Sequence, residues 1–243
     1  FCEDLGNVSN KDMDYNDVVF DAWIYVRRYY QGGTPVTLGV DSNGDNIYKE
    51  DHYKTFIQPL AAGGTLPLNI GNMTSEIHTV FGVGQGTMVN TYIEGSQVRA
   101  ELCVNQETLP AEITLRGELT SFYSRSGGIC LKNIPVFVQQ NDEVSELDAE
   151  MGDAPHKFRA DIGTAWAGER IIISEAYTGF QDWVNSRIEP WNTVVSSKVM
   201  NFNYTDNHPV NIEVDDQWNY GGGAGPNSSS ASGDSGSDSG SDS

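Results

Sequence analysis

The residues best suited to chemistry are the acidic and amide side chains at the start of the chain. Asp12, Asp14 and Asn16 occupy alternate positions, so a curled loop can turn their side-chain oxygens to one side. Hard cations such as Ca²⁺ take about six to eight oxygen ligands. The sequence therefore predicts a calcium site, with these candidate ligands: Glu3, Asp4, Asp12, Asp14, Asn16, Asp17 and Asp21.

This loop matches a helix–loop–helix calcium hand only in part. Asp17 stands where that motif has a glycine, and no glutamate stands at the twelfth position. The loop runs into residues 18–26, whose β-branched and aromatic side chains are typical of a strand. We therefore expect the carbonyl of Val18 to serve as the main-chain ligand.

The alternative is that Asp and Asn crowd into turns because their side chains bond nearby backbone, without any metal. Against this, the five carboxylates from Asp4 to Asp21 have only Lys11 as a basic neighbour. Like charges at such spacing repel unless they are neutralised, so the composition favours a cation.

Length and charge limit the class of protein. The 243 residues suit one β domain over 1–220, followed by a flexible tail over 221–243 that is rich in Gly, Ser and Asp. The net charge of −20, from 14 basic and 34 acidic residues, argues against nucleic acid or anionic lipid as a partner. No apolar run approaches the ~20 residues that span a bilayer.

Short strand-like runs separated by turn residues predict an all-β fold, an antiparallel β-sandwich or jelly roll with one or two short helices. The runs are 20–30, 36–40, 53–60, 97–104, 112–119, 134–138 and 171–174. Residues 174–184 predict one short helix, because Tyr177, Phe180, Trp183 and Val184 recur at helical spacing. We expect this face to fill the core.

Two further motifs have alternative interpretations. Asp41, Asn43 and Asp45 alternate like calcium ligands, but the Asn43–Gly44 pair between two apolar runs favours a plain hairpin. Cys103 and Cys130 lie in strand-like runs and could pair across strands, or Cys2, Cys103 and Cys130 could all be free thiols.

Several segments together resemble the LruC-type domain family of secreted and surface lipoproteins, notably of Bacteroidota. The opening carries the clearest part of the resemblance, and further segments follow in the family's order. The segments are 3–6, 14–21, 61–68, 76–83, 88–91, 134–138, 154–158 and 176–184. The resemblance implies an extracellular or cell-surface, outer membrane-associated β module that binds calcium, and it covers residues 2–191. Residues 194–218 match nothing in the family.

These observations favour a non-enzymatic, calcium-stabilised surface module: an adhesin, a filament or a scaffold component. Its partners would be other surface proteins, glycans or further copies of itself, joined through an exposed strand edge. The first alternative is a glycan-binding module, because the five tryptophans could stack on sugars. A glycoside hydrolase is a second alternative. Glu76 and His78, on one side of an expected strand, more simply belong to the core.

Overall fold

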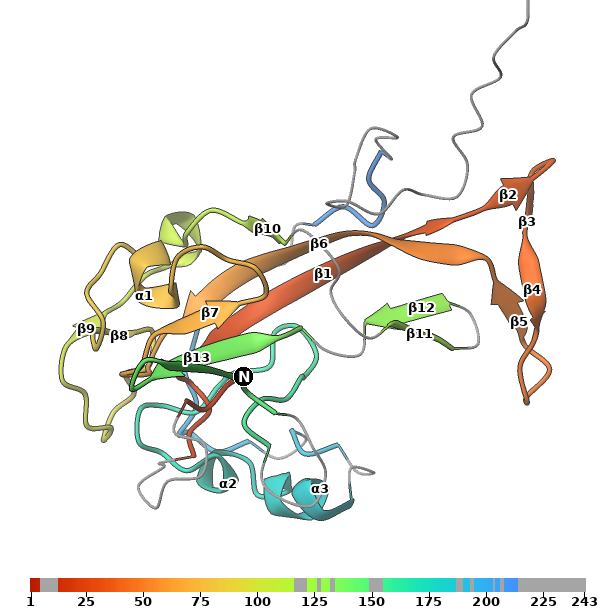
Figure 1. Ribbon diagram of the computed structural model, residues 1–243. Coiled ribbons are helices and arrows are strands. Elements are labelled where there is room, and N and C mark those ends of the chain that lie inside the picture. Colours follow the sequence, from red (N-terminus) through yellow and green to blue (C-terminus); the bar gives the residue numbers. More distant parts are fainter. Residues whose placement is uncertain are drawn as a thin grey trace, which may run out of the picture.

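The computed structural model describes residues 1–4, 13–115, 122–125, 128–131, 134–148, 155–186, 190–192, 195–202, 204–205 and 208–213. Strands far outnumber helices among these residues, and most strand pairs are antiparallel, so the predicted all-β class is confirmed (Figure 1). The expected tail over 221–243 lies outside the described residues. Among the described residues, no helix is both long and apolar enough to cross a membrane.

The first sheet has the strand order β1-β6-β10. β1 (Val19–Arg28) pairs antiparallel with β6 (Glu50–Ala61), and the short β10 (Ile113–Leu115) pairs with β6 only from Thr55 to Ile57. Beyond β10 the two long strands continue as a ribbon that projects from the body of the molecule (Figure 1). β-branched and aromatic residues dominate β1, as the sequence predicts.

The tip of this ribbon holds two small hairpins. They are formed by β2 (Tyr30–Gln31) with β3 (Thr34–Pro35), and by β4 (Thr37–Val40) with β5 (Asn46–Tyr48). The carboxylate of Asp41 accepts the N–H groups of Asn43 and Asp45 at 2.8 and 2.9 Å, while Gly44 takes a positive φ of 88°. The predicted hairpin is therefore confirmed, and the Asp41 carboxylate supports the turn itself.

The second sheet has the order β14-β13-β7 and packs against the first. It consists of β7 (Leu68–Ile70), β13 (Val136–Gln140) and β14 (Glu143–Glu146). Buried side chains of both sheets, among them Ile57 and Leu115 from one and Ile70 and Val138 from the other, share one core. This contact of two layers is the sandwich arrangement. A separate hairpin joins β11 (Phe122–Arg125) to β12 (Gly128–Leu131).

The expected strand at 97–104 is mostly wrong. Only β9 (Glu101–Leu102) forms there, and it pairs parallel with β8 (Met88–Val89). The Glu101 carboxylate accepts the N–H groups of Thr91 and Tyr92 at 3.1 and 2.7 Å, which closes a loop beside the pair. Cys103 is a free, exposed thiol, so it forms no disulfide with Cys130.

The helical elements are short: α1 (Ile77–Val80), the 3₁₀ turn η1 (Gln106–Thr108), α2 (Ile173–Ala176) and α3 (Phe180–Ser186). The strand expected at 171–174 is wrong because helix α2 begins at Ile173, whose buried side chain packs among aromatic rings. A short apolar run alone does not separate a strand from a buried helix. The single helix expected over 174–184 is interrupted at Tyr177, which is extended and bridges to Val195.

The predicted core role of that segment is confirmed. Tyr177, Phe180 and Val184 are at most 2% exposed, and their cluster also contains Tyr15 and Trp191. This aromatic core lies beside the N-terminal segment, because Tyr15 is a member of the cluster and Phe1 packs against it. It therefore positions the acidic loop of residues 13–17.

Candidate metal centre

The acidic loop is anchored in the aromatic core by Tyr15. The Tyr15 ring lies 4.9 Å from Phe158 and 5.5 Å from Phe180, measured between ring centroids. Met13 and Tyr15 both take positive φ, 53° and 58°, which curls the chain tightly at alternate residues. This curl is the shape that the alternating Asp14 and Asn16 predict.

Asp14 fastens the loop to the segment before α2. One of its oxygens accepts the N–H of Arg170 at 2.6 Å, and the other accepts the N–H of Asn16 at 3.3 Å. The carbonyl of Met13 accepts the N–H of Ile173 at 2.9 Å. Asp14 is thus a loop anchor as well as a negative charge.

Three buried carboxylates form the centre of the site. Glu3, Asp4 and Asp17 each offer an oxygen, and these oxygens lie within 4.8 Å of one another. Their residues are only 1%, 5% and 6% exposed. Backbone pairing brings them together: Cys2 bridges to Asn16 and Val18, so that Glu3 and Asp4 lie beside the loop.

The opposite wall of the site is the backbone of the segment that follows β6. Gly63 and Gly64 donate their N–H groups to the carbonyls of Asn16 and Asp17 at 2.9 and 3.4 Å. The next two N–H groups, of residues 65 and 66, donate to the same Asp4 oxygen at 3.1 and 3.0 Å. Four successive amides thus hold the acidic segment.

The acidic segment lies so close to both glycines that neither position has room for a side chain. A Cβ added at Gly63 would overlap Oδ1 of Asn16, and one at Gly64 would lie 2.7 Å from Oδ2 of Asp4. Real Cβ atoms are not found so close to an oxygen. The Gly63–Gly64 pair is therefore part of the site, whereas the resemblance over 61–68 implies no such role for it.

Electrostatics make this arrangement costly unless it is neutralised. Burial raises the pKa of Asp17 well above its ordinary value of 3.8, and the nearby charges of Asp4, Glu3 and Asp14 raise it further. Desolvation and like charges both disfavour the ionised form. The group is stabilised either by a proton or by a bound cation.

One neutral side-chain oxygen lies on the same loop, at the residue before Asp17. Asn16 is fully buried, and its Nδ2 donates to the carbonyl of Ala167 at 3.1 Å. Its Oδ1 is buried and has no hydrogen-bond partner. A buried amide oxygen without a donor is costly, and a hard cation would satisfy it.

The structure brings together some of the predicted ligands and not others. Glu3, Asp4 and Asp17 form the group, with Asn16 and Asp14 on the same loop. Asp21 lies in β1 opposite Gln58 and is not part of the group. Asp12 lies outside the described residues. The Val18 carbonyl, the expected main-chain ligand, accepts the N–H of Cys2 at 3.0 Å.

Glu76 and His78 do not lie on a strand as expected. Glu76 caps helix α1, and its carboxylate accepts the N–H groups of His78 and Thr79 at 2.9 and 2.7 Å. The His78 ring is fully buried beside the same carboxylate. Glu76 and His78 therefore support the N-terminal end of helix α1.

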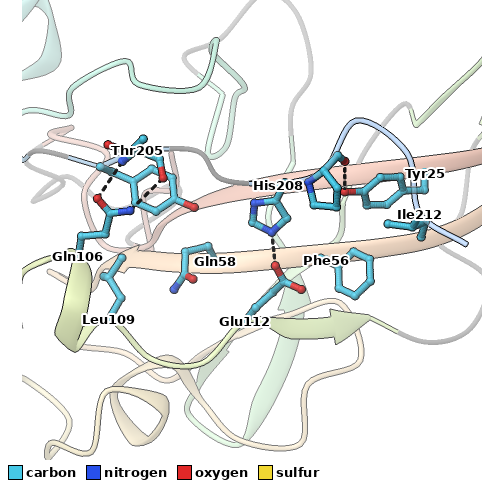
Figure 2. A pocket seen from close by; sticks show the side chains of 11 residues that line it. Tyr25, Phe56, Gln58, Gln106, Leu109, Glu112, Thr205, His208 and Ile212 are labelled. Atoms are coloured by element: carbon cyan, nitrogen blue, oxygen red, sulfur yellow. Dashed lines mark hydrogen bonds and ion pairs between the residues drawn. The ribbon is translucent and has the colours of Figure 1, made fainter.

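A separate pocket of about 420 Å³ lies between the first sheet and residues 204–205 and 208–212 (Figure 2). Its polar walls are joined by internal bonds: His208 to Glu112, Gln106 to Thr205, and the Tyr25 hydroxyl to the carbonyl of Pro209. The His208 ring also stacks on Trp23, with centroids 3.3 Å apart. These bonds hold the segment across the sheet.

A scan against protein-family models and searches of curated proteins and of solved structures gave no match to this chain.

We predict that Gly63→Ala lowers the free energy of unfolding by about 1–3 kcal/mol, because its Cβ displaces Asn16. Gly84→Ala is the matched control, since Gly84 is exposed and a Cβ there meets nothing within 4 Å. Chemical denaturation measures both. Equal stabilities of the two variants would contradict the close backbone approach.

We also predict a distinctive pH dependence for the metal-free protein. Because the folded-state pKa of Asp17 is raised, this group's contribution is fully present below about pH 4 and is lost as the pH rises through the folded pKa. Asp17→Asn keeps the shape without the charge. In chelator at pH 7 the variant should melt above the parent, and the difference should shrink towards pH 4.

Proposed function

We propose that this chain is a non-enzymatic β module that is stabilised by calcium and works outside the cell. The observation that supports the proposal best is the buried group of Glu3, Asp4 and Asp17, with the unsatisfied Oδ1 of Asn16 on the residue before Asp17. All four side chains offer oxygen, the ligand type that Ca²⁺ prefers. Histidine and cysteine, which favour zinc, contribute nothing to this group.

Bound calcium would act on stability and not on a substrate. Its charge would stabilise the ionised acids, whose burial and mutual repulsion raise the pKa of Asp17, and it would give Oδ1 of Asn16 a partner. The ligands come from residues 3–4 and from the loop at 14–17, so the ion would join the N-terminus to the start of β1. Its binding energy would be added to the folding free energy.

The burial of these acids argues against hydrolysis at this site. A glycoside hydrolase needs two carboxylates that flank a bound sugar. Glu3, Asp4 and Asp17 are at most 6% exposed, and none of them lines the pocket of Figure 2. A polysaccharide has no described route to them, so a structural role for the acids is the better proposal.

A glycan-binding role has less support. Stacking on sugar requires exposed rings, yet Trp23, Trp166 and Trp191 are at most 9% exposed, and Trp183 packs within the aromatic core. Trp218 lies outside the described residues. The described tryptophans are better suited to supporting the fold than to forming a sugar platform.

The extracellular location is proposed from chemistry and resemblance together. Calcium sites of extracellular modules have dissociation constants of about 10⁻⁴–10⁻³ M, so they fill only where calcium is abundant. The net charge of −20 fits a surface that is exposed to such a medium. The resemblance to the LruC-type family points to the same surroundings, and we propose membership of that family on this ground.

We predict that calcium raises the melting temperature at neutral pH. At ten times the dissociation constant, binding adds about 1.4 kcal/mol, which corresponds to roughly 3–5 °C for a domain of this size. Differential scanning calorimetry with calcium and with chelator measures the shift. Elemental analysis of the dialysed protein measures the bound ion.

Two variants sharpen this experiment. Asp17→Asn should abolish the calcium-dependent shift, because it removes one of the three central carboxylates. Asp45→Asn, in the exposed hairpin, should leave the shift unchanged. An identical melting temperature with and without calcium, together with no bound metal, would refute the proposal. A shift lost only in Asp45→Asn would move the site to the hairpin.

A further inference from the structure

The pocket of Figure 2 is a feature that the calcium site does not use. Its volume of about 420 Å³ lies within the range of roughly 300–1,000 Å³ that is usual for small-molecule sites. Its walls come from β1, from β6, from the stretch between η1 and β10, and from residues 204–205 and 208–212. Four separate parts of the chain thus surround one hollow.

The floor of the pocket is the outer face of β6. Ile57 is fully buried in the core between the two sheets, so its neighbours Phe56 and Gln58 point to the opposite face. Gln58 is nevertheless only 9% exposed. A buried glutamine is uncommon, and its amide needs hydrogen-bond partners.

The Gln58 amide is held in one orientation. Its Nε2 donates to the carbonyls of Pro59 and Pro110 at 3.2 and 2.9 Å, which uses both of its N–H groups. In the part of the chain that the structure describes, no group donates to its Oε1. The floor of the pocket therefore carries a fixed hydrogen-bond acceptor.

The Glu112 carboxylate adds a negative charge to the wall. His208 contacts one of its oxygens, and no described residue donates to the other. The contact with His208 is an ion pair only while the imidazole is protonated. The described residues that line the pocket include no Lys or Arg, so the lining is negative whenever His208 is neutral.

Apolar surface lies next to these acceptors. Phe56 and Tyr25 meet edge to face with ring centroids 5.7 Å apart, and Leu109 and Ile212 add aliphatic surface. Aromatic rings attract cations as well as apolar groups. Figure 2 shows Gln58, Glu112 and Phe56 along the same side of the pocket.

These properties favour one class of ligand. An anion would face the Glu112 carboxylate without a Lys or Arg in the described lining to bind it. A ligand without N–H or O–H groups would leave the acceptors of Gln58 and Glu112 unpaired. An ammonium group brings several donors and a positive charge, and the net charge of −20 attracts cations to the protein.

We propose that this pocket binds a small organic cation, an ammonium group on an apolar body. The ammonium group donates to the Glu112 carboxylate and to Oε1 of Gln58, and the apolar body packs on Phe56 and Leu109. This proposal does not depend on bound calcium, and its test is separate from the melting experiment.

Nuclear magnetic resonance of the ¹⁵N-labelled full chain tests the binding, with benzylamine as the probe. The side-chain amide signal of Gln58, assigned by its loss in Gln58→Met, reports directly from the floor of the pocket. At about pH 7.5, where an ordinary imidazole is mostly neutral, benzylamine should shift this signal in a saturable way. Benzyl alcohol, a neutral probe of the same shape, should bind about tenfold more weakly, because hydrogen bonds to charged groups are stronger.

Charge variants locate the cation. Glu112→Gln keeps an oxygen for His208 but removes the charge, so it should weaken benzylamine by about tenfold and leave benzyl alcohol unchanged. Glu107→Gln is the matched control: Glu107 is exposed, lies in η1 and does not line the pocket, so both probes should bind as to the parent. Phe56→Leu should weaken both probes, because it removes part of the apolar floor.

Three results would overturn the proposal. The first is the absence of a saturable benzylamine shift at Gln58 in the parent chain. The second is binding of benzyl alcohol or of benzoate as tight as that of benzylamine, which would show that the pocket does not select a cation. The third is an equal effect of Glu112→Gln and Glu107→Gln on benzylamine, which would assign the attraction to overall charge and not to this pocket.

Discussion

The burial of three carboxylates against one another is the constraint on which the N-terminal half of this structure depends. Charges within 4.8 Å, removed from water, repel strongly, and burial first and this repulsion second raise the pKa of Asp17. Backbone N–H groups donate to two of these carboxylates. The N–H of Asp4 donates to the Asp17 carboxylate, and the N–H groups of residues 65 and 66 donate to the Asp4 carboxylate. These donors reduce the repulsion without removing it, so a cation or a proton must do the rest.

This constraint links parts of the chain that are distant in sequence. Residues 2–4 pair with the loop at 16–18 and with His156, the loop pairs with Gly63 and Gly64, and Asp14 binds the backbone at Arg170. A calcium hand gathers its ligands within a single loop, whereas these acids meet only after the tertiary fold has formed. An ion bound here would therefore stabilise the tertiary fold, because the unfolded chain would hold no such site.

Local sequence signals predict some elements of the fold, but they do not predict which acids meet in the site. Strand propensity in 18–26 and the Asn43–Gly44 turn are local signals, and the structure has the strand and hairpin that they indicate. Local spacing also picked out Glu3, Asp4 and Asp17 as acids of one site. It could not separate them from Asp21, which lies opposite Gln58 on the sheet, because their grouping depends on the pairing of Cys2 with Asn16 and Val18.

The missed features are those that depend on contacts between distant segments. The Gly63–Gly64 pair reads in sequence as an ordinary turn, and only the approach of Asn16 and Asp4 gives it a function. The break at Tyr177 follows from its bridge to Val195, eighteen residues later, and not from its helix propensity. The apolar run at 171–174 became a helix because Ile173 is buried against rings that lie elsewhere in the sequence.

The acidic site and the ribbon are mechanically connected through the start of β1. Asp17 lies two residues before Val19, where β1 begins, and the same strand continues into the projecting ribbon. The base of the ribbon is held by two layers, whereas Ile24 and Val26 further along it are 37% and 38% exposed. An exposed strand of this kind keeps a fixed direction only if its base is rigid. Neutralising the buried acids would therefore stabilise the place from which the ribbon extends.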